Sequence, residues 1–126
     1  MWIGLVGSEM CIRDRTLSCE LPKTLVKKND IHITSKRNFD CFQDTELDML
    51  LKRTLNVKNI IICGVNTDTC VYGTTFGASN RGYNPIVIEC CTGSMRGEDQ
   101  HKTALKIMSQ SIAWVMKKEE ILNKLN

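Results

Sequence analysis

One segment constrains the fold of this chain more than any other, because it reads as a buried strand, a tight turn and a helix in immediate succession. Residues 59–65 are Asn-Ile-Ile-Ile-Cys-Gly-Val, and the Asn-Thr-Asp-Thr-Cys that follows places Cys70 where a helix is expected to begin. The consecutive apolar positions from Ile60 are typical of a parallel strand covered on both faces. The segment therefore predicts an α/β fold with Cys70 near the carboxyl end of a parallel strand, where open α/β sheets place their active sites.

This expected position makes Cys70 a candidate nucleophile. The first N–H groups of a helix lack intrahelical partners, and the helix dipole is positive at that end. Both effects favour the thiolate over the thiol, and the thiolate is the reactive form of cysteine. The alternative for Cys70 is a packed helix cysteine that behaves as a small hydrophobe.

Strands and helices are expected to alternate along the rest of the chain. The expected strands are 30–34, 59–65, 85–89 and 111–116, and the expected helices are 44–55, 69–80, 97–110 and 117–126. In the first of these helices, leucines recur at helical spacing on one face. Strands alternating with helices at this spacing indicate βαβ units and a parallel sheet.

Composition limits the class of protein. The chain has 126 residues, of which 42% are hydrophobic and 25% charged, which is ordinary for one soluble globular domain. A net charge of +3 with both signs interspersed gives no nucleic-acid patch, and no apolar run approaches transmembrane length. The seven cysteines include no Cys-x-x-Cys pair, so we expect neither a disulfide scaffold nor a zinc site, and a cytoplasmic protein. Cys63 and Cys90 lie in apolar runs and are expected to act as small hydrophobes.

Residues 5–15 read differently from the rest of the chain. Their sequence, Leu-Val-Gly-Ser-Glu-Met-Cys-Ile-Arg-Asp-Arg, matches the conceptual translation of a transposase-type sequencing adapter. We therefore interpret residues 1–15 as a non-native, adapter-derived segment and residues 16–126 as a partial domain. A short native N-terminal segment is the alternative. On the first interpretation, the natural gene continues upstream.

The order and spacing of several motifs point to a family. The motifs are Asp-Ile-His-Ile-Thr-Ser-Lys at 30–36, Phe-Gln-Asp-Thr-Glu-Leu at 42–47, Gly-Val-Asn-Thr-Asp-Thr-Cys-Val at 64–71, Ala-Ser-Asn-Arg-Gly-Tyr at 78–83, and His101. From about residue 17 to residue 115 the chain resembles the isochorismatase-like cysteine hydrolase superfamily. The resemblance implies a Rossmann-like three-layer sandwich with a parallel sheet that lacks its first two strands here.

The resemblance also implies an Asp–Lys–Cys triad, in which Cys70 matches the nucleophile and Lys36 the lysine. An ammonium group near a thiol lowers the thiol pKa, and an aspartate can accept the thiol proton and later deliver it to a leaving amine. Attack on an amide carbonyl would give a thioester, which water would hydrolyse.

Further site features come from the same resemblance. It implies a cis peptide bond between Val65 and Asn66, which would direct the N–H groups of Asn66 and Cys70 at a developing oxyanion. Phe42 and Thr67 are candidates for the substrate pocket. His101 alone would most simply be a helix surface residue, and two separated histidines do not make a metal site. We assign no cofactor-binding residue.

The triad aspartate is the departure from the family pattern. In the family it ends the first strand, which has no counterpart after residue 16. The aspartates considered for its role lie in the suspect segment or in the wrong segments: Asp14, Asp40, Asp44 and Asp68. In the family sheet order 3-2-1-4-5-6, the two missing strands would lie between the strand before Lys36 and that before Cys70. We therefore expect this chain alone to be inactive and poorly folded.

The leading interpretation is a cysteine hydrolase of small amide or ureido C–N bonds, with substrates such as carbamoyl amino acids, biuret-like compounds or nicotinamide. Cys70 argues against isochorismate cleavage, because family members with that activity lack this cysteine. The alternative is a non-catalytic isochorismatase-like scaffold or interaction protein, and a thiol redox protein is a third. We expect a small-molecule substrate, no nucleic-acid or membrane partner, and a homo-oligomer at full length.

Overall fold

The computed structural model describes residue 24 and residues 27–126 of the chain. The helices are α1 (Leu47–Met49), α2 (Tyr72–Asn80), α3 (Glu98–Ser111) and α4 (Lys118–Leu125), and the strands are β1 (Asn59–Val65), β2 (Asn84–Gly93) and β3 (Trp114–Met116). Two π-helical segments complete them: η2 (Leu50–Thr54) continues α1, and η3 (Thr67–Val71) leads into α2. The predicted division at residues 15 and 16 lies outside the described residues.

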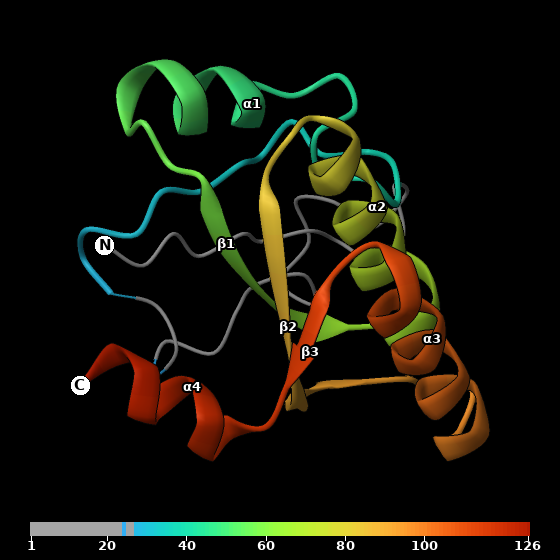
Figure 1. Cartoon of the computed structure of the whole chain (residues 1–126). Helices are drawn as coiled ribbons and strands as arrows, with labels where there is room; N and C mark the ends of the chain where they lie inside the picture. The colour runs from blue at the N-terminus through green and yellow to red at the C-terminus, as the bar shows by residue number, and fades with distance from the viewer. Residues whose placement is uncertain (1–23, 25–26) are drawn as a thin grey trace.

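The strands form a parallel sheet, as predicted. Its order is β1-β2-β3, so each strand lies beside the next one along the chain. Ile62 of β1 is opposite Val87 of β2, and the register shifts between Ile62 and Gly64. In Figure 1, α2 and α3 lie together on one side of the sheet, and α4 lies on the other. The α/β class predicted from the alternation of elements is therefore confirmed.

The main core lies between the sheet and the pair α2 and α3. Val87, Ala78 and Met108 are fully buried there, and each comes from a different element. Ile88 follows Val87 in β2 and so points to the opposite face of the sheet, where it is buried outside this cluster. Because one continuous cluster joins the sheet to both helices, we expect cooperative unfolding rather than the poor folding predicted from the sequence.

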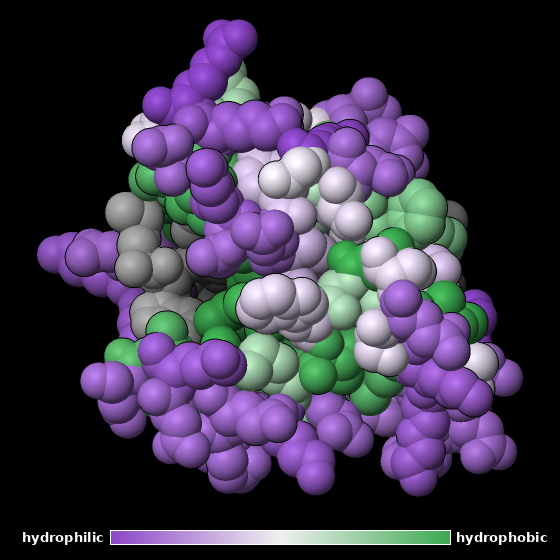
Figure 2. Space-filling model, in the orientation of Figure 1, coloured by the Kyte–Doolittle hydropathy of each residue, from purple (hydrophilic) through white to green (hydrophobic). Residues whose placement is uncertain are grey.

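β1 is less covered than its apolar sequence predicts. Only Ile62 is buried in this strand, and Val65 is 53% exposed. Among the described strands, β1 pairs with β2 alone. Cys63 and Cys90 are accordingly exposed rather than packed as small hydrophobes, which corrects that prediction. Figure 2 shows hydrophobic residues gathered in the middle of one face of the molecule, with hydrophilic residues around them.

The strand predicted at 30–34 is wrong. These residues form irregular chain that enters a turn at Thr34 and Ser35, although Ile33 is only 1% exposed and belongs to the core. A strand requires hydrogen bonds to a neighbouring strand, and none of the described strands pairs with this segment. The alternating pattern around Ile33 therefore indicates an irregular segment that packs one apolar side chain into the core, and not a strand.

The helix predicted at 44–55 is shorter and changes type. Asp44 has a left-handed φ of +56°, so it stands outside the helix, which begins at Leu47. Just before this helix, the Leu47 N–H donates a hydrogen bond to the Thr45 hydroxyl oxygen over 3.4 Å. From Leu50 onward the helix is π-helical.

The remaining elements agree with prediction except at their ends. β1 has the predicted bounds, while β2 runs past the predicted 85–89 to Gly93. β3 is shorter than the predicted 111–116, because α3 continues to Ser111. Gly82, with a φ of +82°, follows α2 where a side chain would be strained. None of the described helices is long and apolar enough to cross a membrane.

Candidate active site

The turn between β1 and the Cys70 helix has an unusual backbone. The peptide bond between Val65 and Asn66 is cis, at the predicted position. The Asn66 carbonyl accepts hydrogen bonds from the N–H groups of Thr69 and Val71, over 3.2 and 3.1 Å. The two donors are the residues before and after Cys70, so these hydrogen bonds place Cys70 in the first turn of the helix.

The helix begins earlier than predicted, and its first turn is π-helical. It starts at Thr67 rather than Thr69, so Cys70 is its fourth residue rather than its second. Short π-helical turns at the ends or in the middle of α-helices are frequent at functional sites. Sequence reasoning missed this feature because a π turn has no composition that distinguishes it from an α turn.

The chain from Phe39 to Cys41 runs along one face of this helix. Cys70, Thr74 and Gly77 are four and seven residues apart and so share that face. The Cys41 N–H donates to Oγ1 of Thr74 over 3.1 Å, and this hydroxyl lies 3.1 Å from the Cys41 sulfur. A Cβ on Gly77 would collide with the Asp40 carboxylate, so the glycine permits the close approach. Cys41 is thus held one helical turn from Cys70.

The charges of Lys36, Cys70 and Asp40 act on this buried thiol. Burial raises the pKa of Cys41, while the hydrogen bond from Thr74 and the charge of Lys36 act to lower it, and Cys70 and Asp40 act to raise it. Lys36 is 8% exposed, and no described carboxylate forms an ion pair with it. The catalytic roles of Lys36 and Cys70 stay predictions.

Phe42 lies in the core. It is 4% exposed, its ring stacks on Tyr83 at 5.5 Å between centroids, and the Arg81 guanidinium lies 5.0 Å from its centroid. The Asp40 carboxylate contacts two members of this group. It pairs with Arg81 at 3.2 Å and accepts a hydrogen bond from the Phe42 N–H. Asp40 is therefore ion-paired with Arg81 and not with Lys36. The pocket role of Phe42 stays a prediction.

The loop after β2 forms hydrogen bonds and an ion pair with the turn before Cys70. The Ser94 hydroxyl donates to Asp68 over 2.6 Å, and Arg96 pairs with the same carboxylate at 3.2 Å. The Met95 N–H donates to the side-chain oxygen of Asn66 over 2.9 Å. The Ser94 hydrogen bond is the main reason that the pKa of Asp68 is lowered. From the sequence, Asp68 is considered only as a triad aspartate and lies in the wrong segment for that role. No local pattern connects it with a residue 26 positions later.

His101 supplies another link to this turn. Its Nδ1 lies 2.8 Å from the Thr67 hydroxyl oxygen, and both side chains are buried. The prediction of a surface position was wrong, because the imidazole turns inward from α3 to meet η3. Thr67 is fully buried, and its pocket role stays a prediction.

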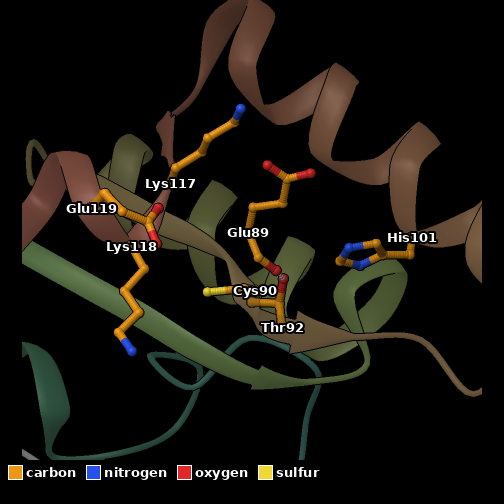
Figure 3. A pocket seen from close by; sticks show the side chains of 7 residues that line it. All are labelled: Glu89, Cys90, Thr92, His101, Lys117, Lys118 and Glu119. Atoms are coloured by element: carbon orange, nitrogen blue, oxygen red, sulfur yellow. Dashed lines mark hydrogen bonds between the residues drawn. The ribbon is translucent and has the colours of Figure 1, made fainter.

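An open pocket of about 360 Å³ adjoins His101, between β2, α3 and α4. Figure 3 shows its lining side chains, which are Glu89, Cys90, Thr92, His101, Lys117, Lys118 and Glu119. The pocket meets the Cys70 turn only through His101, since neither Cys70 nor Lys36 lines it. In the part of the chain that the structure describes, no group of three His, Cys, Asp or Glu side chains could hold a metal ion.

Cys63 is expected to be an unreactive thiol despite its exposure. Partial burial of its sulfur, and the neighbouring Cys91 and Cys90, raise its pKa to about 11. Since only the thiolate is alkylated, iodoacetamide at pH 7.5 should modify Cys63 at least about 10-fold more slowly than N-acetylcysteine. Peptide mass mapping over a pH series measures the rate, which should keep rising to about pH 11. Equal rates at pH 7.5 would contradict this prediction.

Comparison with known proteins places the chain among related sequences. The Isochorismatase domain model matches residues 7–120. The isochorismatase family protein YecD of Escherichia coli O157:H7 is 33% identical over 97 residues, which cover 77% of this chain and 50% of that protein. The chain thus spans about half the length of the curated relatives that it matches.

Solved structures share the fold. An isochorismatase-like hydrolase from Alkaliphilus metalliredigens has a TM-score of 0.82 at 24% identity, covering 89% of this chain and 61% of that one. The nicotinamidase SaPncA from Staphylococcus aureus has a TM-score of 0.65 at 34% identity, covering 71% of this chain and 54% of that one. The likeness to the first structure supports the fold. The second structure shows that a protein named as a nicotinamidase has a similar fold.

Proposed function

Since this chain belongs to the isochorismatase family, we propose that it carries the nucleophile of a cysteine hydrolase that cleaves small amide or ureido C–N bonds. The observation that carries this proposal is Lys36, which is only 8% exposed and whose charge, like that of Cys70, acts on the buried Cys41 thiol. A lysine without an ion-pair partner in the described residues is costly to bury, so its retention favours a chemical role. The likeness to a nicotinamidase supports the amide substrate class.

The proposed reaction proceeds through a thioester. The Cys70 sulfur attacks the substrate carbonyl carbon, and the N–H groups of Asn66 and Cys70 donate to the oxyanion. The C–N bond then breaks as the leaving amine gains a proton, and water hydrolyses the C–S bond of the thioester. Lys36 stabilises the negative charge on sulfur and on the oxyanion. The thiol proton passes to the triad aspartate that the family resemblance implies and from it to the leaving amine, and no described carboxylate pairs with Lys36 as that aspartate would.

An activated ester tests the nucleophile separately from that acid. The leaving group of 4-nitrophenyl acetate departs as an anion, so acylation needs only the thiolate and the oxyanion donors. We expect acetyl transfer to Cys70 at least about 10-fold faster than to Cys90, an exposed thiol outside the turn. Peptide mass mapping measures both rates in one sample, and Cys70→Ala should remove the fast phase.

The non-catalytic scaffold makes the opposite prediction. Without an activated nucleophile, Cys70 and Cys90 would acquire acetyl groups at similar rates. Faster transfer to the more exposed Cys90 would also overturn the proposed function, because accessibility alone would then govern the reaction.

A further inference from the structure

One short stretch of chain holds three consecutive residues of the turn before Cys70. Residues 94–101 contribute the Met95 N–H to Asn66, the His101 ring to Thr67, and two side chains to Asp68. Asn66 forms the cis peptide bond with Val65, and Thr67 and Asp68 begin the helical turn that carries Cys70. The position of the turn is therefore set by a partner about 30 residues away, in addition to its own helix.

Asp68 is the most strongly bound of the three turn residues. Its side chain is 9% exposed, and its two carboxylate oxygens have separate partners, Ser94 at 2.6 Å and Arg96 at 3.2 Å. Ser94 also accepts the Arg96 N–H through its hydroxyl oxygen over 3.1 Å, which closes a small network within the loop. Arg96 is 66% exposed, so the Ser94 hydrogen bond is the protected contact of the network.

We propose that Asp68 is a positioning residue for Cys70, which holds the Asn66 and Cys70 N–H groups in the relative geometry that an oxyanion requires. This inference rests on the proposed function. In the sequence, Asp68 lies two residues from each of the proposed donors, Asn66 and Cys70. Its carboxylate binds this part of the turn to the loop after β2. Both of its oxygens are occupied by the loop, so it acts through the backbone and not on substrate.

Two reagents separate positioning from general stability. Acylation by 4-nitrophenyl acetate builds an oxyanion, whereas alkylation by iodoacetamide is a displacement at a saturated carbon and builds none. The ratio of the two Cys70 rates therefore reports on the oxyanion donors alone. A loss of folded protein lowers both rates together and leaves their ratio unchanged.

Asp68→Asn is expected to lower the Cys70 acylation rate by about 10-fold or more, because one misdirected oxyanion donor can cost 10²- to 10³-fold. The alkylation rate should change by less than about 3-fold, since the thiol and its surroundings are retained. Glu98→Gln, which removes an exposed carboxylate of α3 paired with Lys102, is the matched control and should leave the ratio unchanged.

Ser94 provides the second variant, which leaves the carboxylate in place and carries the test where Asp68→Asn does not fold. Ser94→Ala should lower the acylation-to-alkylation ratio, and Ser94→Thr, which keeps the hydroxyl, should restore it. Equal falls of both rates in Asp68→Asn or Ser94→Ala would overturn the positioning role. Absence of preferred Cys70 acylation in the unmodified chain would instead overturn the proposed function, so the two failures are distinguishable.

Discussion

Replacing Lys36 by methionine is expected to slow acylation of Cys70 by 4-nitrophenyl acetate about 10- to 100-fold, because the proposed reaction uses the positive charge of Lys36. Negative charge moves from sulfur to the carbonyl oxygen during attack, and an ammonium group close to both positions would stabilise it throughout. The methionine side chain is similar in length and keeps the packing, so the change isolates the charge.

The same substitution should stabilise the fold. Lys36 is 8% exposed and forms no ion pair with a described carboxylate, so a largely buried side chain carries a charge that no described carboxylate offsets. Replacing such a charge by an apolar group is expected to raise the free energy of unfolding by about 1 kcal/mol or more, and the midpoint of thermal unfolding by several degrees. Opposite changes in reactivity and stability are typical of a residue kept for function.

Lys106→Met is the control for the Lys36 experiment. Lys106 is exposed on α3, and its loss should change neither the acylation rate nor the unfolding midpoint appreciably. Circular dichroism melts and peptide-mapped acylation would be measured on the same preparations. A fall in stability for Lys36→Met would show that the ammonium has a stabilising partner, and an unchanged acylation rate would remove Lys36 from the proposed reaction.

The parts of the fold predicted from sequence are those governed by local patterns. The apolar run of β1 and the alternation of strand and helix segments after it can be read from nearby residues, so β1, α2 and α3 were predicted to within a few residues. The segment at 30–34 has an equally plausible pattern, but a strand also needs a neighbour. That requirement is non-local, and Ile33 anchors the segment in the core without one.

For the candidate site too, features carried by a local motif could be predicted from the sequence, and contacts between distant segments could not. The family resemblance predicts roles for Cys70 and Lys36 that stay predictions, whereas the cis bond that it predicts at Val65–Asn66 is present. Cys41 and Asp68 were missed as neighbours of the site, because their contacts join segments 26 to 33 residues apart. Such contacts depend on how α2 and the loop after β2 pack, which the composition of neither segment reveals.

Met108→Ala is expected to be the most destabilising single change considered, since Met108 is fully buried between α3 and the sheet. Truncating a buried methionine to alanine removes apolar burial and leaves a cavity, at a cost of about 2–5 kcal/mol. For a domain of this size that corresponds to a fall of about 10 °C or more in the unfolding midpoint.

The neighbouring residue gives a matched control, because Ile107 is 43% exposed on the same helix. Ile107→Ala should cost less than about 1 kcal/mol, since a half-exposed side chain leaves no cavity. The comparison also bears on the site, because α3 carries His101 and so holds Thr67. If α3 docks through Met108, Met108→Ala should reduce Cys70 acylation only as far as it reduces the folded fraction. Similar melts for the two variants would mean that α3 is not packed on the sheet, and its contacts to the Cys70 turn could not then be maintained.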